Sequence, residues 1–159
     1  MRAYAHKYLY YRAMADSRRH LVTSAWGAVL QVHAAVVPLL DHRLQAEVGM
    51  SLSWYDVLLE LAAAPERRLR MTDLGQRVVL SRTRVSRLVD EIAAAGLVVR
   101  EQNPQDGRSA YATLTAEGLS RYRKAAPTYL AAIEQHFSST LDDEELRTVA
   151  TVLQRVLTE

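Results

Sequence analysis

The chain has 159 residues, of which 49% are hydrophobic and 24% charged, and its formal net charge is +2. This length fits one domain with appended helices, and the absence of cysteine excludes a disulfide framework, a cysteine-based zinc site and a thiol redox switch. Arg and Tyr interrupt any hydrophobic centre in residues 1–20, so no secretory signal is predicted there. No apolar run is expected to reach the roughly 18 residues of a membrane span, and a cytoplasmic protein without membrane contact is predicted.

Positive charge is concentrated in the middle of the chain. Residues 66–108 carry nine Arg against six acidic residues, whereas residues 125–159 carry two Arg against six acids. A basic middle indicates where a nucleic acid would dock. The sequence has no Ser/His/Asp order with a strained glycine turn, no phosphate-binding glycine loop and no His spacing suited to a metal. We therefore expect no enzymatic activity, no metal and no cofactor.

Two helices are predicted before residue 65. The first runs from about His20 to Val48, with a possible bend at Pro38 and a stop at Gly49. Its broad apolar stripe consists of Val29, Val32, Val36, Leu39, Leu40 and Leu44. The second runs from Ser53 to about Ala63, and Ser53 and Asp56 have the spacing of a capping box. Thr72 is then expected to cap a short helix over residues 73–79.

Residues 81–96, SRTRVSRLVDEIAAAG, predict a helix with one apolar face. Its apolar residues recur at i, i+3, i+4 and i+7 and are Val85, Leu88, Val89 and Ile92. Thr83 and Arg87 point directly away from this face, and Arg84 and Ser86 flank them. The helix begins near Ser81.

The first two turns of this helix carry basic charge without any acid, in Arg82, Arg84 and Arg87. Such a surface suits a polyanion, and Arg is the side chain best matched to guanine edges and phosphates. We predict that Thr83, Ser86 and Arg87 contact bases and that Arg82 and Arg84 contact phosphates. Ser81, at the start of the helix, is included among the predicted DNA contacts.

A β-hairpin is predicted to follow Gly96. Residues 97–102 form its first strand, the turn residues Asn103–Gly107 connect it, and Ser109–Leu114 return as the second strand. Arg100 either reaches a phosphate or pairs with an acidic residue, and the sequence does not decide between these.

Two more helices complete the chain. Thr115 is expected to cap a helix that runs to about His136 with a kink at Pro127. Asp142 and Glu145 have capping-box spacing at the start of the last helix. The fold predicted is mainly α (α+β), a winged helix-turn-helix with long N- and C-terminal helices that form a dimerisation domain.

The expected domain organisation follows from these elements. Residues 1–20 are an N-terminal extension, residues 21–48 and 116–158 are dimerisation helices, and residues 53–115 are the winged helix-turn-helix. The outer helices carry more apolar surface than a small winged-helix core can cover, so a partner helix is expected. A homodimer would present two arginine-rich helices related by a two-fold axis, and its operator would be near-palindromic, with half-sites about 34–36 Å apart.

Five motifs, in this order and spacing, resemble the MarR (multiple antibiotic resistance regulator) family of bacterial transcription factors. They are MTDL at residues 71–74, LSRTRVSRLVD at 80–90, GLVVR at 96–100, DGR at 106–108 and LTAEG at 114–118, and the likeness covers roughly residues 21–158. The resemblance implies a homodimer that binds double-stranded DNA at a palindromic promoter site, usually as a repressor. It also implies that Arg108 enters the minor groove, with Asp106 helping to orient it.

Many members of this family release DNA when a small, often phenolic, anion binds between the dimerisation helices and the DNA-binding domain. This chain lacks the cysteine of the peroxide-sensing branch and the N-terminal Trp of the urate-responsive branch. The candidate ligand residues are His33, Trp54, Tyr55, Asp56 and Tyr111. The alternative is that these side chains belong to the core or to an interface.

A second functional class stays open at this point. The chain could be a winged-helix protein-interaction or dimerisation module that does not bind DNA. Such modules tend to have a neutral or shortened helix and wing, whereas both are basic and complete here. The salt dependence of DNA binding distinguishes the two classes.

Overall fold

The computed structural model describes residues 18–78, 82–103 and 106–158, and the side chains of Arg82 and of residues 106–108 lie outside this description. The chain divides into two compact units, Met1–Pro38 and Leu39–Glu159. The first helix, α2 (Arg18–Val48), runs through the boundary between them and contains Pro38. The predicted N-terminal extension, residues 1–20, falls almost entirely outside the described residues.

In the first unit, α2 exposes apolar side chains along its length. Leu21 is 66% exposed and Trp26 61% exposed, and Val22, Val29, Leu30 and Val32 are exposed as well. No charged residue occurs between positions 21 and 40. By length and composition this helix could cross a membrane, so the prediction that no stretch meets that criterion is wrong. Length and mean hydropathy alone do not distinguish a membrane-spanning helix from one that packs against other protein helices. In α2, weakly polar residues separate the apolar ones.

The second unit begins with the last turns of α2, where Leu40 and Leu44 are buried. Gly49 ends the helix at a φ of +62°, a left-handed conformation that glycine adopts without steric cost. Helix α3 (Leu52–Ala63) follows, and its buried residues are Tyr55, Val57, Leu58 and Leu61. They join Leu74 of α4 (Met71–Arg77) and the apolar face of α5 (Arg82–Ala94) in one hydrophobic core.

The first turn of α3 differs from the sequence prediction. The helix begins at Leu52, one residue before Ser53, and its N-cap is Ser51, whose Oγ accepts a hydrogen bond from the backbone N–H of Trp54 at 3.3 Å. The N–H of Leu52 donates to Oδ1 of Asp41 on α2 at 2.7 Å. Ser51 and Asp41 therefore cap this helix between them, and the prediction of a capping box formed by Ser53 and Asp56 is wrong.

The helix-turn-helix also differs at its start. Strand β1 (Arg68–Arg70), which the sequence analysis did not predict, leads directly into α4, whose N-cap is Arg70 without a side-chain bond. The predicted cap, Thr72, lies inside the first turn of α4 and donates its hydroxyl to Asp73 at 3.1 Å. The cap prediction is wrong because the chain enters the helix straight from the strand.

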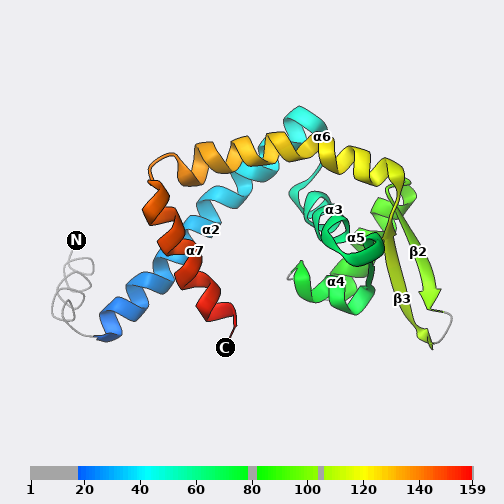
Figure 1. The fold of residues 1–159 in the computed structure, drawn as a ribbon, viewed down its shortest axis with the longest axis horizontal. Helices are drawn as coiled ribbons and strands as arrows, with labels where there is room; N and C mark the ends of the chain where they lie inside the picture. The colour runs from blue at the N-terminus through cyan, green and yellow to red at the C-terminus, as the bar shows by residue number, and fades with distance from the viewer. Residues whose placement is uncertain (1–17, 79–81, 104–105, 159) are drawn as a thin grey trace, which may run out of the picture. The chain divides into compact units, whose positions relative to one another are not determined.

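The sheet has the order β1-β3-β2, and both pairs of neighbours are antiparallel. Strands β2 (Val98–Asn103) and β3 (Asp106–Leu114) form the predicted hairpin, which we call the wing. The strands extend further than expected, since Asn103 and Asp106 still pair after a register shift between Gln102 and Asn103. The connecting turn is therefore shorter than the predicted Asn103–Gly107. Figure 1 shows the wing beside α4 and α5.

Thr115 caps helix α6 (Ala116–Ile133) as predicted, because its Oγ1 accepts a hydrogen bond from the N–H of Gly118 at 2.9 Å. The helix continues into a π-helical segment, η2 (Glu134–Ser138), so its α-helical part ends three residues before His136. Helix α7 (Asp143–Leu157) has the predicted capping box of Asp142 and Glu145. None of the described residues of α7 is buried, and Leu157 is 83% exposed.

Candidate nucleic-acid interface

The core fixes the orientation of α5. Its apolar face is buried as predicted, with exposures of 9% or less at Val85, Leu88, Val89 and Ile92. On the opposite face Thr83, Arg84 and Arg87 are exposed, and Ser86 is half-buried. The periodicity therefore predicted correctly which side chains this helix presents to solvent.

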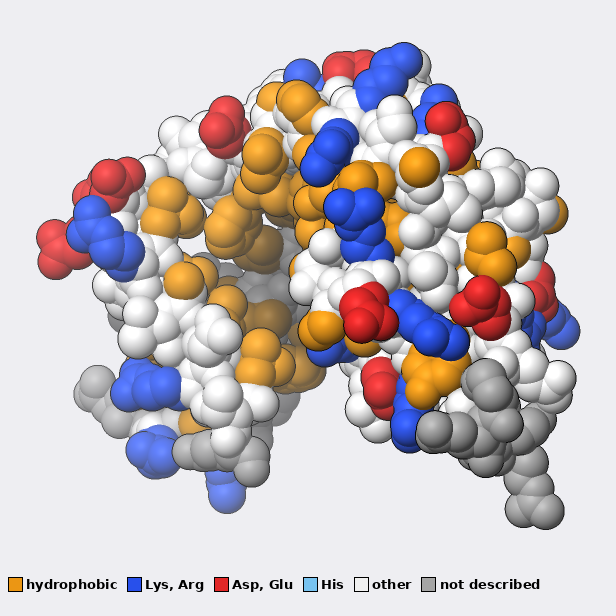
Figure 2. All heavy atoms as spheres, turned by 45° about the vertical axis from the view of Figure 1, so that its right-hand side comes forward, with side chains coloured by type: hydrophobic (Ala, Val, Ile, Leu, Met, Phe, Trp, Pro, Cys, Tyr) orange, Lys and Arg blue, Asp and Glu red, His pale blue; other side chains and the backbone are white. Residues whose placement is uncertain are grey.

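The arginines of this region divide into paired and unpaired ones. Arg77 pairs with Glu60 on α3 at 3.3 Å, and Arg68 pairs with Glu101 on β2 at 3.4 Å. Among the residues that the structure describes, neither Arg84 nor Arg87 forms an ion pair. Figure 2 shows Lys and Arg side chains interleaved with Asp and Glu over the part of the second unit that faces the viewer. The positive charge that the described side chains of α5 offer to an anionic partner is therefore that of Arg84 and Arg87.

Arg100 forms an ion pair with an acidic residue, which is one of its two predicted alternatives, and its contact with a phosphate stays a prediction. Its Nη1 donates to Oδ1 of Asp90 at 2.6 Å and to Oγ of Ser86 at 3.3 Å. Both partners lie on α5, and Arg100 lies on β2 of the wing. In this structure Arg100 therefore pairs with an acid of its own domain, and the hydroxyl of Ser86 is engaged with it.

Some predicted DNA contacts cannot be placed. Ser81 lies outside the described residues. Arg82 begins α5, but its side chain is not described, and the same holds for Asp106 and Arg108 at the start of β3. The predicted wing contact of Arg108 and the orienting role of Asp106 stay predictions.

Of the candidate ligand residues, three come from α3. Tyr55 is 2% exposed, and its ring packs against Tyr122 and Tyr129 of α6, with centroids 5.5 and 4.4 Å away. Trp54 is half-buried against the same core. Burial, with the neighbouring tyrosines, raises the pKa of the Tyr55 hydroxyl above its ordinary value. Tyr55 is therefore a core residue at the seam between α3 and α6.

Asp56 is a half-buried carboxyl group at this seam. Burial, and to a lesser degree the charge of Glu60 on the same helix, raises its pKa from 3.8 to about 6. The pKa of Tyr129 is raised by burial and by the charge of Asp56. Among the described residues, the Asp56 carboxylate has no hydrogen bond or ion pair that compensates its burial.

Tyr111 does not join this group. Tyr111 lies on β3 next to Ala112, which is fully buried, so the alternation of the strand places Tyr111 on the outer face of the sheet. There the guanidinium of Arg68 lies 4.0 Å from the centroid of its ring, and the Nε of Arg70 donates to its hydroxyl at 3.3 Å. His33 is exposed on α2 in the first unit. The arginines of β1 were missed because only the register of the sheet brings them to Tyr111.

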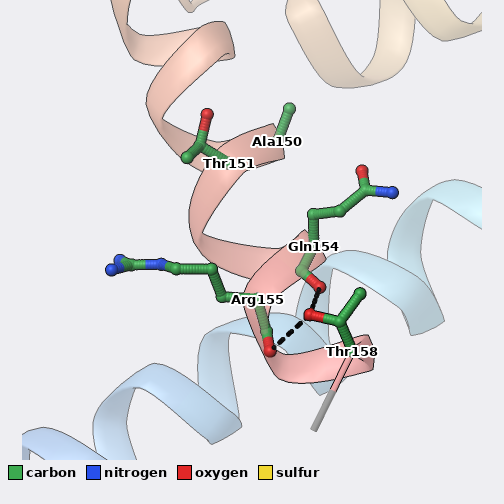
Figure 3. Close-up of a pocket in the computed structure, with 5 residues that line it drawn as sticks. All are labelled: Ala150, Thr151, Gln154, Arg155 and Thr158. Carbon is green, nitrogen blue, oxygen red and sulfur yellow. Dashed lines mark hydrogen bonds between the residues drawn. The ribbon is translucent and has the colours of Figure 1, made fainter.

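Surface hollows occur along α7 and the residues at its two ends. One of them, on α7, is lined by Ala150, Thr151, Gln154, Arg155 and Thr158 (Figure 3). Thr158 donates its hydroxyl to the carbonyl oxygens of Gln154 and Arg155, each at 3.3 Å. All five residues belong to one helix or its end, so the hollow is a groove between its side-chain ridges. Among the described residues, no group of three or more His, Asp or Glu is arranged to hold a metal.

The helix-turn-helix of α4 and α5, enclosed in sequence by strand β1 and the hairpin of β2 and β3 of one three-stranded sheet, defines a winged helix-turn-helix protein. A model of the MarR family matches residues 48–109. The structure is similar to Sco3205, a MarR family transcriptional regulator from Streptomyces coelicolor solved in complex with DNA. The TM-score is 0.78 and the identity 30%, over 89% of this chain and 87% of that one. It is also similar to AbsC, another such regulator from the same organism, with a TM-score of 0.76 and 31% identity over 86% of this chain and 91% of that one.

The chain therefore belongs to the MarR family of transcriptional regulators. The HTH-type transcriptional repressor YetL of Bacillus subtilis is 28% identical over 97 residues, which are 61% of this chain and 58% of the relative. The uncharacterised regulator YkoM of the same organism is 34% identical over 76 residues, 48% of this chain and 49% of the relative. The chain thus matches about half to three fifths of the length of these two curated relatives, both of which are named as HTH-type transcriptional regulators or repressors.

Proposed function

We propose that this protein is a homodimeric, sequence-specific DNA-binding regulator that represses transcription from a near-palindromic promoter site. Helix α5 would lie in the major groove, with Thr83 and Arg87 at the base edges and Arg84 at a phosphate, and the wing would reach the minor groove through Arg108. The proposal rests mainly on the exposed positive charges of Arg84 and Arg87. Both are exposed on the face opposite the core, and among the described residues neither is neutralised by an acid.

The dimer proposed here rests on the exposed apolar surfaces of the terminal helices. Val152, Leu153, Val156 and Leu157 of α7 are exposed, and so are the apolar residues of α2 in the first unit. At about 25 cal/mol per Å² of apolar surface removed from water, such faces favour association. Residues 21–48 and 116–158 are accordingly the proposed dimerisation helices, and residues 53–115 the proposed DNA-binding unit.

The decisive experiment selects bound sequences from a random duplex library and then measures affinity by fluorescence anisotropy at several salt concentrations. A DNA-binding regulator should give a palindromic motif, and log K should fall by about 0.9 per phosphate contact for each decade of salt. No selected motif and an almost flat salt dependence would favour the protein-interaction module instead.

Two substitutions test the assignment of the helix face. Arg87→Ala should reduce discrimination against the wrong base by about 1–3 kcal/mol, because a bidentate base contact is lost. Arg84→Ala should weaken binding to all duplexes alike and reduce the salt slope by about 1. Arg147→Ala is the control, since Arg147 is exposed on α7 and pairs with Asp143 at 3.7 Å. Unchanged site preference in Arg87→Ala would refute its role as a base reader.

We further propose that an aromatic ligand which releases DNA would bind near the seam between α3 and α6, where Trp54, Asp56 and the tyrosines lie. The Asp56 carboxylate, mostly ionised at pH 7.5, favours a neutral or cationic aromatic molecule over an anionic one. Calorimetric titration with benzylamine and with salicylate tests this. Heat and loss of DNA affinity with salicylate alone would contradict the preference, and no response to either would leave Trp54 and Tyr55 as core residues.

A further inference from the structure

Arg100 faces α5 across the inner side of the wing. On β2, Val98 is buried in the core whereas Val99 is 47% exposed on the outer face. Because side chains alternate along a strand, Arg100 lies on the same side as Val98, toward α5. Arg100 is two residues beyond Val98, toward the tip of the wing.

From this position Arg100 contacts two turns of α5 at once. Its Nη1 donates to Asp90 at 2.6 Å and to Ser86 at 3.3 Å, and Ser86 and Asp90 are four residues apart, on one face of the helix. We call these three residues the wing bracket. The guanidinium charge is already matched by a carboxylate at hydrogen-bond distance, unlike the charges of Arg84 and Arg87.

We propose that Arg100 is a positioning residue that fixes the wing relative to α5 and thereby supports discrimination between DNA sites, and that it is not a phosphate contact. The inference rests on the proposed function. A site is recognised correctly only when helix and wing reach their grooves together, so loosening one against the other weakens the specific complex more than the non-specific one. Non-specific binding, which depends on phosphate contacts, needs no fixed angle between helix and wing.

The same contacts give Ser86 a different role from the predicted base contact. Its side chain is half-buried, and its hydroxyl oxygen accepts from Arg100, so it contributes to the wing bracket in place of the base contact predicted from the helix periodicity. Thr83 and Arg87 are left as the exposed base readers on this face. The ion pair at 2.6 Å is the stronger part of the bracket, because both of its groups are charged.

The test uses the full-length protein, the duplex selected with the wild type, and a scrambled duplex of the same length, each at several salt concentrations. The quantity compared is the ratio of the two affinities. Arg100→Gln and Asp90→Asn should each lower this ratio about threefold or more, and the double variant should lower it no further than either single one. The salt slope of Arg100→Gln should equal that of the wild type. Arg84→Gln, the matched control, should lower the slope by about 0.9.

Ser86→Ala keeps the ion pair and should change the ratio less than twofold, with no change of preference at any single base position. Thermal melts establish that each variant is folded before its affinities are compared. If Arg100→Gln weakens both duplexes by the same factor and lowers the salt slope by about 0.9, Arg100 is a phosphate contact and the inference is wrong. It is also wrong if Arg100→Gln changes neither quantity. A wild type that does not prefer its selected duplex would refute the proposed function itself, before any variant is compared.

Discussion

Replacing Asp56 by Asn should stabilise the protein at neutral pH. The Asp56 carboxyl is half-buried at the seam between α3 and α6, and its pKa is raised from 3.8 to about 6, chiefly by burial and then by Glu60. A carboxyl whose pKa is higher in the folded state binds more protons when folded. Its ionisation therefore lowers the free energy of unfolding. The full decrease is present above pH 6, and the decrease vanishes well below pH 3.8. Asn has nearly the same shape and carries no charge at any pH.

The size of the effect follows from the two pKa values. The difference between 3.8 and about 6 corresponds to about 3 kcal/mol if the group is fully shielded from water. Because Asp56 is only half-buried, solvent screening reduces this to about 1 kcal/mol. We expect Asp56→Asn to raise the free energy of unfolding by about 1 kcal/mol at pH 7.5, by about half as much at pH 5, and by almost nothing at pH 4.

Urea unfolding followed by circular dichroism at these three pH values, at one fixed protein concentration, measures the difference. Glu91→Gln is the matched control, because Glu91 is exposed on α5 and forms no ion pair among the described residues. A loss of stability in Asp56→Asn at pH 7.5 would show that the carboxylate has a stabilising partner. An equal gain at all three pH values would show that the charge is not the cause.

Three further predictions concern the helices that follow the wing. Gly118→Ala should destabilise the fold by about 3 kcal/mol or more, visible as a lowered melting temperature, because its Cβ would clash with the backbone oxygen of Leu97. Val156→Asp should shift the protein toward monomer in light scattering, while Thr151→Asp on the same helix should not; a Val156→Asp variant that remains dimeric would contradict the proposed interface. Asp142→Ala should cost about 1 kcal/mol in chemical denaturation, because the N–H groups of Glu144 and Glu145 lose their acceptor.

Elements with a strong apolar period or a local cap could be predicted from the sequence. The buried face of α5 was predicted residue by residue, because its apolar spacing matches the helical repeat. The start of α6 at Thr115 and the capping box of α7 depend on side chains within three residues of the helix end, so they too are visible in the sequence.

Features that depend on contacts between distant segments could not be predicted. Strand β1 has three residues and exists through its pairing with β3, so neither its existence nor the stacking of Arg68 on Tyr111 has a local signal. The cap of α3 was misassigned because Ser51 and Ser53 are both plausible caps, and Asp41, eleven residues before Leu52, helps to decide between them. The contact of Arg100 with Asp90 at 2.6 Å also joins two distant segments, so the sequence alone could not choose it over a phosphate contact.

The absence of any buried residue among the described part of α7 has a consequence for how the protein responds to its own abundance. A helix of fifteen residues with an exposed apolar face is only marginally stable alone in water, so in the proposed dimer association would stabilise it. If the form that occupies an operator is the dimer, occupancy at low abundance rises with the square of the subunit concentration. Dilution through cell growth would then lower operator occupancy more steeply than it would for a regulator that binds as a single subunit.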